Sequence, residues 1–333
     1  GGSGNNTMNR ITHLGVEGAI TVAINTDKQH LDHTRAMQKL LVGRHITRGL
    51  GAGGDPSMGR KCAEAGRDVI SKIVHNADLV FITAGLGGGT GTGIAPVVAD
   101  EAKRAGALVV GIVTTPFHVE RRQRMQRALE GLDQLRKTCD AVLVLDNNRL
   151  LHYVPNLPLD EAFSIMDQLI AEIVKGIIET ITLPSLINLD FADVRTIMQS
   201  RGRALMGIGV AEGEGRAMRA AEEAIICPLL EQSNIHGAKG VIVNIKGGCD
   251  IGMREVQEAV STVQAAAHPD ANIIFGAVIE DDERPELQVT VIAAGFSPSM
   301  SQDYLDNSAV PQTVSRPAGM EETKPDPVQA EAK

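Results

Sequence analysis

The chain is poor in aromatic residues. It has no tryptophan, two tyrosines and six phenylalanines among its 333 residues. Its hydrophobic cores must therefore consist of aliphatic side chains, which a hydrophobic content of 43 % can supply. A chain of this length is long enough to form two domains.

Long apolar runs are also missing. No stretch of about 18 apolar residues occurs, so we expect no transmembrane helix and no direct membrane insertion. No signal-peptide pattern opens the chain. The net charge is −9, which argues against a general electrostatic nucleic-acid binder. We therefore expect no nucleic-acid partner.

Cysteine and metal-binding patterns are sparse. The chain has four widely spaced cysteines that form no Cys-x-x-Cys pair: Cys62, Cys139, Cys227 and Cys249. Reduced thiols in a cytoplasmic protein are the simplest interpretation. The histidines have no partners at metal-ligand spacing, so we expect no metal site made by the protein alone. The motifs HExxH and GxSxG are absent, so hydrolysis by a zinc site or a nucleophilic serine has no support.

The chain does contain a loop made only of glycine and threonine, from Gly87 to Gly93. It follows a strand-like apolar run, Leu79–Ile82, and precedes a helix-like run, Ile94–Ala99. Glycines let backbone N–H groups approach an anion closely. The N-terminus of the following helix adds unpaired N–H donors and the positive end of the helix dipole. The sequence therefore predicts a phosphate cradle.

Two other phosphate motifs fit less well. The segment Gly54–Lys61 lacks the Lys-Ser/Thr ending of a Walker-type loop. The spacing of a dinucleotide fingerprint is partly met through Gly88, but the next acidic residue, Asp100, lies inside the following helix. A dinucleotide-dependent dehydrogenase is therefore kept only as an alternative.

The first half of the chain alternates between strand-like and helix-like segments. The strand-like segments are Ala19–Asn25, Leu79–Thr83, Leu108–Thr114 and Ala141–Leu145, and the helix-like ones are Pro56–Val74, Ile94–Ala105 and Val119–Lys137. This alternation predicts an α/β fold with a parallel sheet between helices. Ligands bind at the carboxyl ends of such strands. We therefore expect one site to be built from the loops Gly1–Asn5, Ala52–Gly54, Gly87–Gly93 and Pro116–Glu120.

The second half predicts a long central helix and a second, smaller α/β domain. The helix is expected over Leu159–Ile181, before Pro184. Strands follow at Ala204–Ala211, Val241–Ile245, Asn272–Ile279 and Gln288–Ala294, with helices at Arg216–Cys227 and Arg254–Ala267. We expect a nucleotide-binding domain at 1–158, a linking helix at 159–183, the second domain at 184–296 and a disordered acidic tail at 297–333.

A second glycine-rich segment, Gly1–Asn5, stands directly before a helix-like run, Thr7–Leu14. A strand normally feeds such a loop, so we expect a strand before Gly1 and interpret the sequence as a fragment of a longer product. The alternative is an engineered linker.

Several motifs in the same order resemble FtsZ, the prokaryotic relative of tubulin. They are the Gly87–Gly93 loop, Gly49–Gly54, Asn188–Val194 and Asn272–Ala277, and the resemblance runs from Gly1 to about Phe296. The segment Leu145–Leu150 resembles the archaeal members of this family in particular. Ser3 stands where the family usually has glycine, and the tail shows no clear copy of the family's adaptor-binding motif.

The resemblance implies a GTPase that binds GTP or GDP, with Mg²⁺ held mainly through the nucleotide. The phosphates would be held by Gly1, Gly2, Ser3, Gly4, Asn5, Gly88, Gly89, Thr90 and Gly91, with Ala52, Gly53 and Gly54 at the γ-phosphate. The nucleoside would be held by Glu120, Arg124, Asn147, Phe163 and Asp167. A carboxylate such as Asp167 can accept both N–H donors of guanine, which adenine does not offer.

Some of these residues also have simpler interpretations. Glu120 and Arg124 are spaced as an ordinary surface pair on a helix. Phe163 is equally compatible with a place in the core, and Asp167 with a solvated helix position.

The resemblance also implies head-to-tail protofilaments that form the cytoplasmic division ring at mid-cell. Asn188, Asp190 and Asp193 would complete hydrolysis in the neighbouring subunit's site. The partners would be further copies of the chain and division-ring adaptor proteins. The alternatives are a tubulin-like protein of cell shape and a nucleotide-dependent regulator that does not polymerise.

Overall fold

Three parallel strands form the centre of the first half: β3 (Leu79–Gly85), β4 (Leu108–Thr115) and β5 (Ala141–Asp146). Every residue of β4 and β5 is buried, as expected for strands covered on both faces. The computed structural model describes residues 1–16, 18–153, 158–182, 189–199, 202–226, 235–280 and 284–296. Residues Gly1–Ser297 form one unit, and the predicted tail lies outside the described residues.

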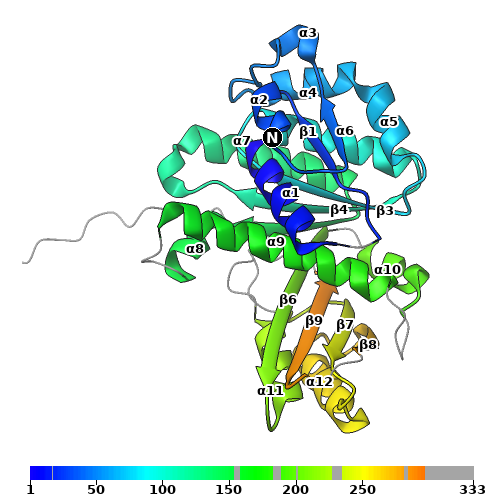
Figure 1. Cartoon of the computed structure of the whole chain (residues 1–333). Coiled ribbons are helices and arrows are strands. Elements are labelled where there is room, and N and C mark those ends of the chain that lie inside the picture. The colour runs from blue at the N-terminus through cyan, green and yellow to red at the C-terminus, as the bar shows by residue number, and fades with distance from the viewer. Residues whose placement is uncertain are drawn as a thin grey trace, which may run out of the picture. The chain divides into compact units, whose positions relative to one another are not determined.

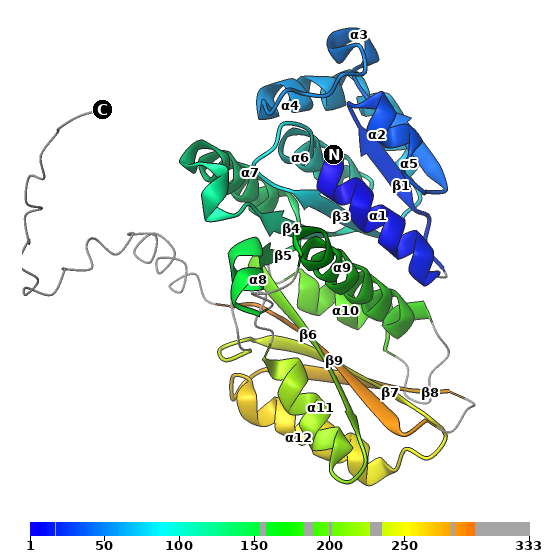
Figure 2. The same cartoon turned by 60° about the vertical axis from the view of Figure 1, so that its left-hand side comes forward.

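Alternate residues of β4 enter two different cores. Leu108, Val110 and Ile112 pack in one core with α1 (Gly2–Leu14) and α9 (Leu159–Thr182). Val109 and Val113 pack in the other with α6 (Thr90–Arg104) and α7 (Arg122–Thr138). The period of two residues thus places α1 and α9 on one face of the sheet and α6 on the other (Figures 1 and 2).

The remaining elements of the first half are short. β1 (Val22–Asn25) and β2 (Gln38–Leu41) form a separate two-stranded parallel sheet. The short helical segments are α2 (Lys28–Asp32), α3 (Arg44–Thr47), α4 (Pro56–Ala65), α5 (Arg67–Val74), the 3₁₀ turn η1 (His118–Glu120) and α8 (Asn147–Tyr153).

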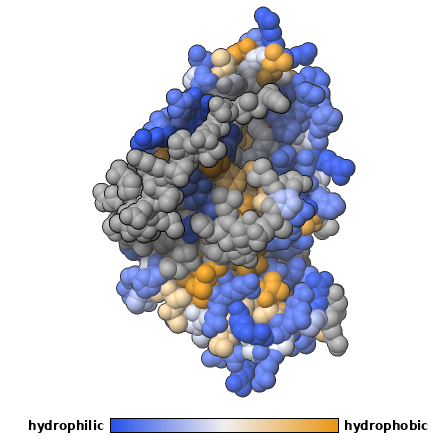
Figure 3. Space-filling view, turned by 90° about the vertical axis from the view of Figure 1, so that its left-hand side faces the viewer, coloured by the Kyte–Doolittle hydropathy of each residue, from blue (hydrophilic) through white to orange (hydrophobic). Residues whose placement is uncertain are grey.

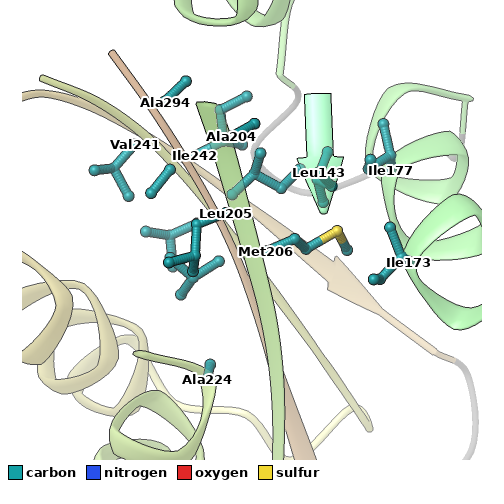
Figure 4. Packing of buried hydrophobic residues seen from close by; sticks show 14 of the residues in the cluster. Leu143, Ile173, Ile177, Ala204, Leu205, Met206, Ala224, Val241, Ile242 and Ala294 are labelled. Atoms are coloured by element: carbon teal, nitrogen blue, oxygen red, sulfur yellow. The ribbon is translucent and has the colours of Figure 1, made fainter. Parts of the chain in front are cut away.

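The central helix α9 has 24 residues and is therefore about 36 Å long. Its buried residues recur every three or four positions, at Met166, Ile170, Ile173 and Ile177. In Figure 4, Ile173 and Ile177 point toward Leu143 and Met206, which come from the two halves of the chain. This helix therefore contributes to a core that both halves share.

The second half is a mixed sheet with two helices. β6 (Gly202–Glu212) and β7 (Gly240–Gly247) each pair antiparallel with β9 (Glu286–Ala294), and β7 pairs parallel with β8 (Asn272–Ile279). α11 (Arg216–Ile225) and α12 (Met253–Ala266) pack against each other, and α11 also packs on β6. The short α10 (Phe191–Met198) stands before this sheet in the chain.

The predicted α/β fold with a parallel sheet and a second, smaller domain is confirmed. Three details differ from the sequence analysis. The helix expected over Pro56–Val74 is broken at Gly66, which separates α4 from α5. The segment Gly1–Asn5 is not a loop, because α1 already begins at Gly2. The two sheets are joined, because β5 and β6 pair through Ala141↔Gly202 and Val142↔Arg203.

Candidate functional site

The glycine loop after β3 ends in the first turn of α6, which begins at Thr90. Gly87 has a φ of 93°, a backbone conformation that glycine adopts without strain. Its N–H donates to Oγ1 of Thr92 over 2.9 Å, and the N–H of Gly93 donates to the carbonyl of Gly89 over 3.1 Å. The local sequence thus folds the loop back on its own helix and leaves the first N–H groups of α6 for a ligand.

A second helix N-terminus lies beside the first. A Cβ added to Gly1, the residue before α1, would be 3.0 Å from the backbone nitrogen of Gly91 and 3.3 Å from Cβ of Thr90. The positive ends of two helix dipoles therefore meet at one place. This arrangement favours a bound anion, and phosphate is the common one at such sites.

The Ala52–Gly54 turn borders the same place from another side. We call this turn, the Gly87–Gly93 loop and the N-termini of α1 and α6 the cradle. A Cβ added to Gly89 would lie 2.7 Å from the nitrogen of Asp55 and 2.9 Å from Cβ of Ala52. Arg127 of α7 donates from Nη1 to the carbonyl of Gly54 over 2.8 Å, which holds this turn in place. By contrast, a Cβ on Gly88 would meet nothing within 4 Å, so this residue faces open space.

Residues at the end of β1 also belong to this site, although they were not predicted from the sequence. Oγ1 of Thr26 lies 2.7 Å from Oγ1 of Thr90, so Thr26 belongs to the cradle. Oδ1 of Asn25 accepts from the N–H of Thr26, whereas Nδ2 of Asn25 and Nδ2 of Asn5 are buried without a partner. Buried donors without partners are rare in proteins and suit a ligand that supplies acceptor oxygens. Polar residues directly after the apolar run of β1 were the signal that could have revealed them.

Glu120 and Arg124 form an ion pair at 2.8 Å. Oε1 of Glu120 also accepts from the N–H of Phe117 over 3.0 Å. The start of α7 touches the glycine loop, because a Cβ on Gly87 would lie 2.7 Å from the carbonyl oxygen of Arg124. The pair is therefore both an ordinary i, i+4 pair and a neighbour of the cradle, and its contact with a ribose stays a prediction.

The residues predicted to hold the base come from α8 and α9. Phe163 is 39 % exposed and meets Phe117 edge to face at 5.5 Å, so it is not a core residue. Asp167 is half-buried, and its Oδ1 accepts from Oγ1 of Thr7 over 2.6 Å. Asn147 is buried, and its Oδ1 has no partner. In Figure 3, the side that carries α7 and α8 faces the viewer and shows hydrophobic residues among hydrophilic ones.

Burial raises the pKa of Asp167, whereas the Thr7 hydrogen bond and the charge of Arg10 oppose the rise. The carboxyl is therefore partly shielded from solvent and hydrogen-bonded, so a solvated helix position describes it only in part. Its contact with guanine stays a prediction.

The predicted catalytic acids lie near the amino ends of β3 and β4, opposite to the cradle at the carboxyl end of β3. Asp190 caps α10 by accepting from the N–H of Ala192 over 3.0 Å, and Asp193 follows in the first turn. Both are exposed, and Asn188 lies outside the described residues.

Arg195 fixes where α10 lies. It donates to the carbonyls of Gly106 and Asp78 over 3.2 and 3.4 Å, and these residues stand just before β4 and β3. The cradle stands after the carboxyl end of β3, whose seven residues span about 20 Å. The acids of one chain therefore lie far from the cradle of the same chain.

A large cavity adjoins the cradle, because Gly1, Asn5 and Gly91 are among its lining residues. Its volume is about 820 Å³, and it lies between β1 and β3, with walls from α1, α6 and α9. Its lining is mainly apolar, and among the described strands β1 pairs only with β2 and β3 only with β4. A strand before Gly1 would fit between these two strand edges, and this strand remains a prediction.

In the described part of the chain, no three His, Cys, Asp or Glu residues come together as metal ligands. None of the described helices is both long and apolar enough to span a membrane.

Comparisons with known proteins match both halves of the chain. The model of the Tubulin/FtsZ family, GTPase domain, matches residues 1–155, and that of the FtsZ family, C-terminal domain, matches residues 202–297. "Cell division protein FtsZ 2" of Haloferax volcanii is 53 % identical over 295 residues, which cover 89 % of this chain and 73 % of that protein. The protein of the same name from Methanocaldococcus jannaschii is 48 % identical over 298 residues, covering 89 % and 78 %.

Solved structures show the same likeness. The empty FtsZ dimer of M. jannaschii superposes with a TM-score of 0.82 and 45 % identity, covering 88 % of this chain and 85 % of that one. CetZ2 from Haloferax volcanii, solved as a protofilament bound to GTPγS, has a TM-score of 0.76 but only 21 % identity, covering 93 % and 97 %. The second likeness shows a shared fold alone.

Proposed function

The chain belongs to the FtsZ family of tubulin-like GTPases, and on this premise we propose that it polymerises head to tail into protofilaments of the cytoplasmic cell-division ring. Its fold and GTPase domain are those of the family. The dimer solved for FtsZ of M. jannaschii supports self-association of this chain. Adaptor proteins that tether the ring would be further partners.

In this proposal the cradle holds the phosphates of GTP. The N-termini of α1 and α6 supply backbone donors, and the Ala52–Gly54 turn lies at the γ-phosphate. Asp167 and Asn147 read the base, while Phe163 stacks on it. Mg²⁺ suits this site as a cation bound mainly to the phosphates, because the described residues form no three-ligand cluster.

The observation that carries the proposal is the separation between the cradle and the acids. Asp190 and Asp193 lie beyond the amino ends of β3 and β4, whereas the cradle lies beyond the carboxyl end of β3. A head-to-tail contact brings the acids of one subunit to the nucleotide of the next. There their carboxylates orient the attacking water, and positioning of this kind accounts for much of the catalysis of phosphoryl transfer.

Such a contact joins two different surfaces of identical subunits. When the rotation between subunits does not close a ring, this type of contact generates a filament. Hydrolysis and assembly are then coupled, because each active site is complete only between two subunits.

The test is GTP hydrolysis per subunit as a function of protein concentration, for the parent chain and for Asp193→Ala. We expect a cooperative rise for the parent and its loss in the variant, which should still bind GTP. A rate per subunit that stays constant on dilution below the assembly threshold would overturn the proposal. Binding without turnover at any concentration would indicate a nucleotide-dependent regulator instead.

A further inference from the structure

We propose that Thr7 is a positioning residue for guanine recognition, because its hydroxyl fixes the carboxylate of Asp167 in the orientation that reads the base. This inference rests on the proposed function, in which Asp167 contacts guanine. Thr7 lies on α1 and Asp167 on α9, two helices that lie side by side in both ribbon views (Figures 1 and 2).

The hydroxyl of Thr7 has two acceptors within reach but only one proton. Oδ1 of Asp167 lies at 2.6 Å, and the carbonyl oxygen of Ser3 lies at 3.2 Å. The nearer acceptor carries the charge, and hydrogen bonds to charged acceptors are shorter and stronger than neutral ones. The proton is therefore directed to Asp167. Thr7 is only 1 % exposed, so its hydroxyl is shielded from water.

The bond acts on the state of Asp167 as well as on its orientation. A carboxylate reads guanine only when it is ionised, because only then do both oxygens accept hydrogen bonds. Burial works against ionisation, whereas the Thr7 hydroxyl and the charge of Arg10 work for it. Arg10 of α1 is itself held against α9, because its Nη2 donates to Oγ of Ser164 over 2.7 Å.

Among the described residues, Arg10 is the one charged group that acts on the pKa of Asp167. On α9 itself, the residues one turn away are Phe163, Ser164, Ile170 and Ala171. From α1, the polar groups near it are those of Thr7 and Arg10. Thr7 uses one of the roughly four lone pairs of the carboxylate and leaves the others for the two N–H donors of guanine.

The position of Thr7 also links two parts of the nucleotide site. It lies six residues after Gly1, about 9 Å along α1 from the helix end that belongs to the phosphate cradle. Its partner helix carries both Phe163 and Asp167. The Thr7–Asp167 bond thus ties the helix that starts at the phosphates to the helix that holds the base.

The experiment compares the parent chain with Thr7→Val and Thr7→Ser, using calorimetry to measure binding of GTP and of inosine triphosphate. Valine keeps the shape of threonine but removes the hydroxyl, and serine keeps the hydroxyl. Inosine lacks the 2-amino group and offers the carboxylate one N–H donor instead of two. Its binding therefore depends less on the orientation of the carboxylate.

We expect Thr7→Val to weaken GTP binding about tenfold, which corresponds to about 1.4 kcal/mol. Inosine triphosphate should lose clearly less, and Thr7→Ser should restore the parent's preference for GTP. A thermal melt checks that both variants are folded. If Thr7→Val weakens both nucleotides equally, or neither, Thr7 has only a structural role and the inference is overturned.

Asp167→Asn separates this inference from the proposal on which it rests. Xanthine carries a carbonyl where guanine has its amino group, so an asparagine amide in place of the carboxylate should favour xanthosine triphosphate over GTP. If Asp167→Asn leaves the base preference unchanged, the proposed reading of guanine by Asp167 fails. If that preference changes while Thr7→Val keeps the parent's selectivity, only the role of Thr7 fails.

Discussion

A mixture of two inactive variants gives the sharpest test of catalysis between subunits. One variant, Gly88→Asp, disables the cradle. A Cβ at Gly88 meets nothing within 4 Å, and Gly88 is not among the glycines with positive φ, so an aspartate fits without strain. Its carboxylate would face the phosphates, and two unit charges about 4 Å apart repel by ~1–4 kcal/mol at effective dielectric constants between 80 and 20. GTP binding should weaken by about five- to a thousandfold.

The other variant, Asp193→Ala, leaves the cradle intact. Asp193 is exposed in the first turn of α10, and the length of β3 separates that edge of the sheet from the cradle by about 20 Å. The folding cost is that of one favourable charge near a helix N-terminus, about 0.3–1 kcal/mol. This variant should bind GTP and hydrolyse almost none.

Mixed in equal amounts, the two variants complement each other only across a contact. A contact is active when one subunit has an intact cradle and its neighbour has an intact Asp193. In a randomly ordered filament this holds for about one contact in four, so phosphate release should recover to about one quarter of the parent rate. The assay is phosphate release from the mixture above the assembly threshold, with sedimentation to show that both variants enter the filaments.

The same assay has a clear negative result. If both variants sediment together and the mixture still releases no phosphate, the acids do not act on the neighbour's nucleotide. If Asp193→Ala alone keeps the parent rate, the acid does not take part in hydrolysis at all. Either result would refute the reasoning from the two sheet edges.

Three further predictions concern the rest of the chain. An apolar strand of about six residues fused before Gly1 should fill the 820 Å³ cavity and raise Tm. A fusion of the same length with two prolines should not raise Tm. Equal Tm values for the two fusions would contradict this prediction. Iodoacetamide at pH 8 should label exposed Cys249 before buried Cys62 and Cys139, because burial raises the pKa of the Cys139 thiol to about 12. Labelling is measured by peptide mass spectrometry, and equal labelling of the three thiols would contradict the described burial. Met206→Ala should lower the free energy of unfolding in urea by ~2–5 kcal/mol, since Met206 lies on β6 and is fully buried against α9. A loss below about 1 kcal/mol would contradict that packing.

Sequence patterns predicted the elements whose residues interact with near neighbours. The continuous apolar runs of β4 and β5 were recognised because both faces of these strands are buried. The central helix was expected to begin at Leu159, where it does begin, because its apolar residues recur with a helical period. The glycine loop was recognised because its composition is needed for local backbone geometry at Gly87 and at the start of α6.

Contacts between distant segments were not predictable in the same way. Thr7 and Asp167 are 160 positions apart, and Thr26 and Thr90 are 64 apart, so no local pattern marks either pair. The start of α1 at Gly2 was missed for a different reason. Glycine disfavours helix interiors by about 1 kcal/mol, but here it permits close approach, because a Cβ at Gly4 would lie 2.7 Å from the carbonyl oxygen of Thr83. Tertiary packing therefore overrides the local preference at this place.

One sheet explains why binding and activation would fall on different subunits. β3 starts next to Asp78, whose carbonyl helps to hold Arg195 and the helix of the two acids, and it ends at Gly85, before the cradle. Shortening the distance between the two ends would require shorter parallel strands, and the strands β3 to β5 contribute residues to both cores. The length that stabilises the fold is thus the length that keeps the acids from the chain's own nucleotide. Under the proposed mechanism, a free subunit retains GTP, and GTP is hydrolysed only where two neighbouring subunits are in contact.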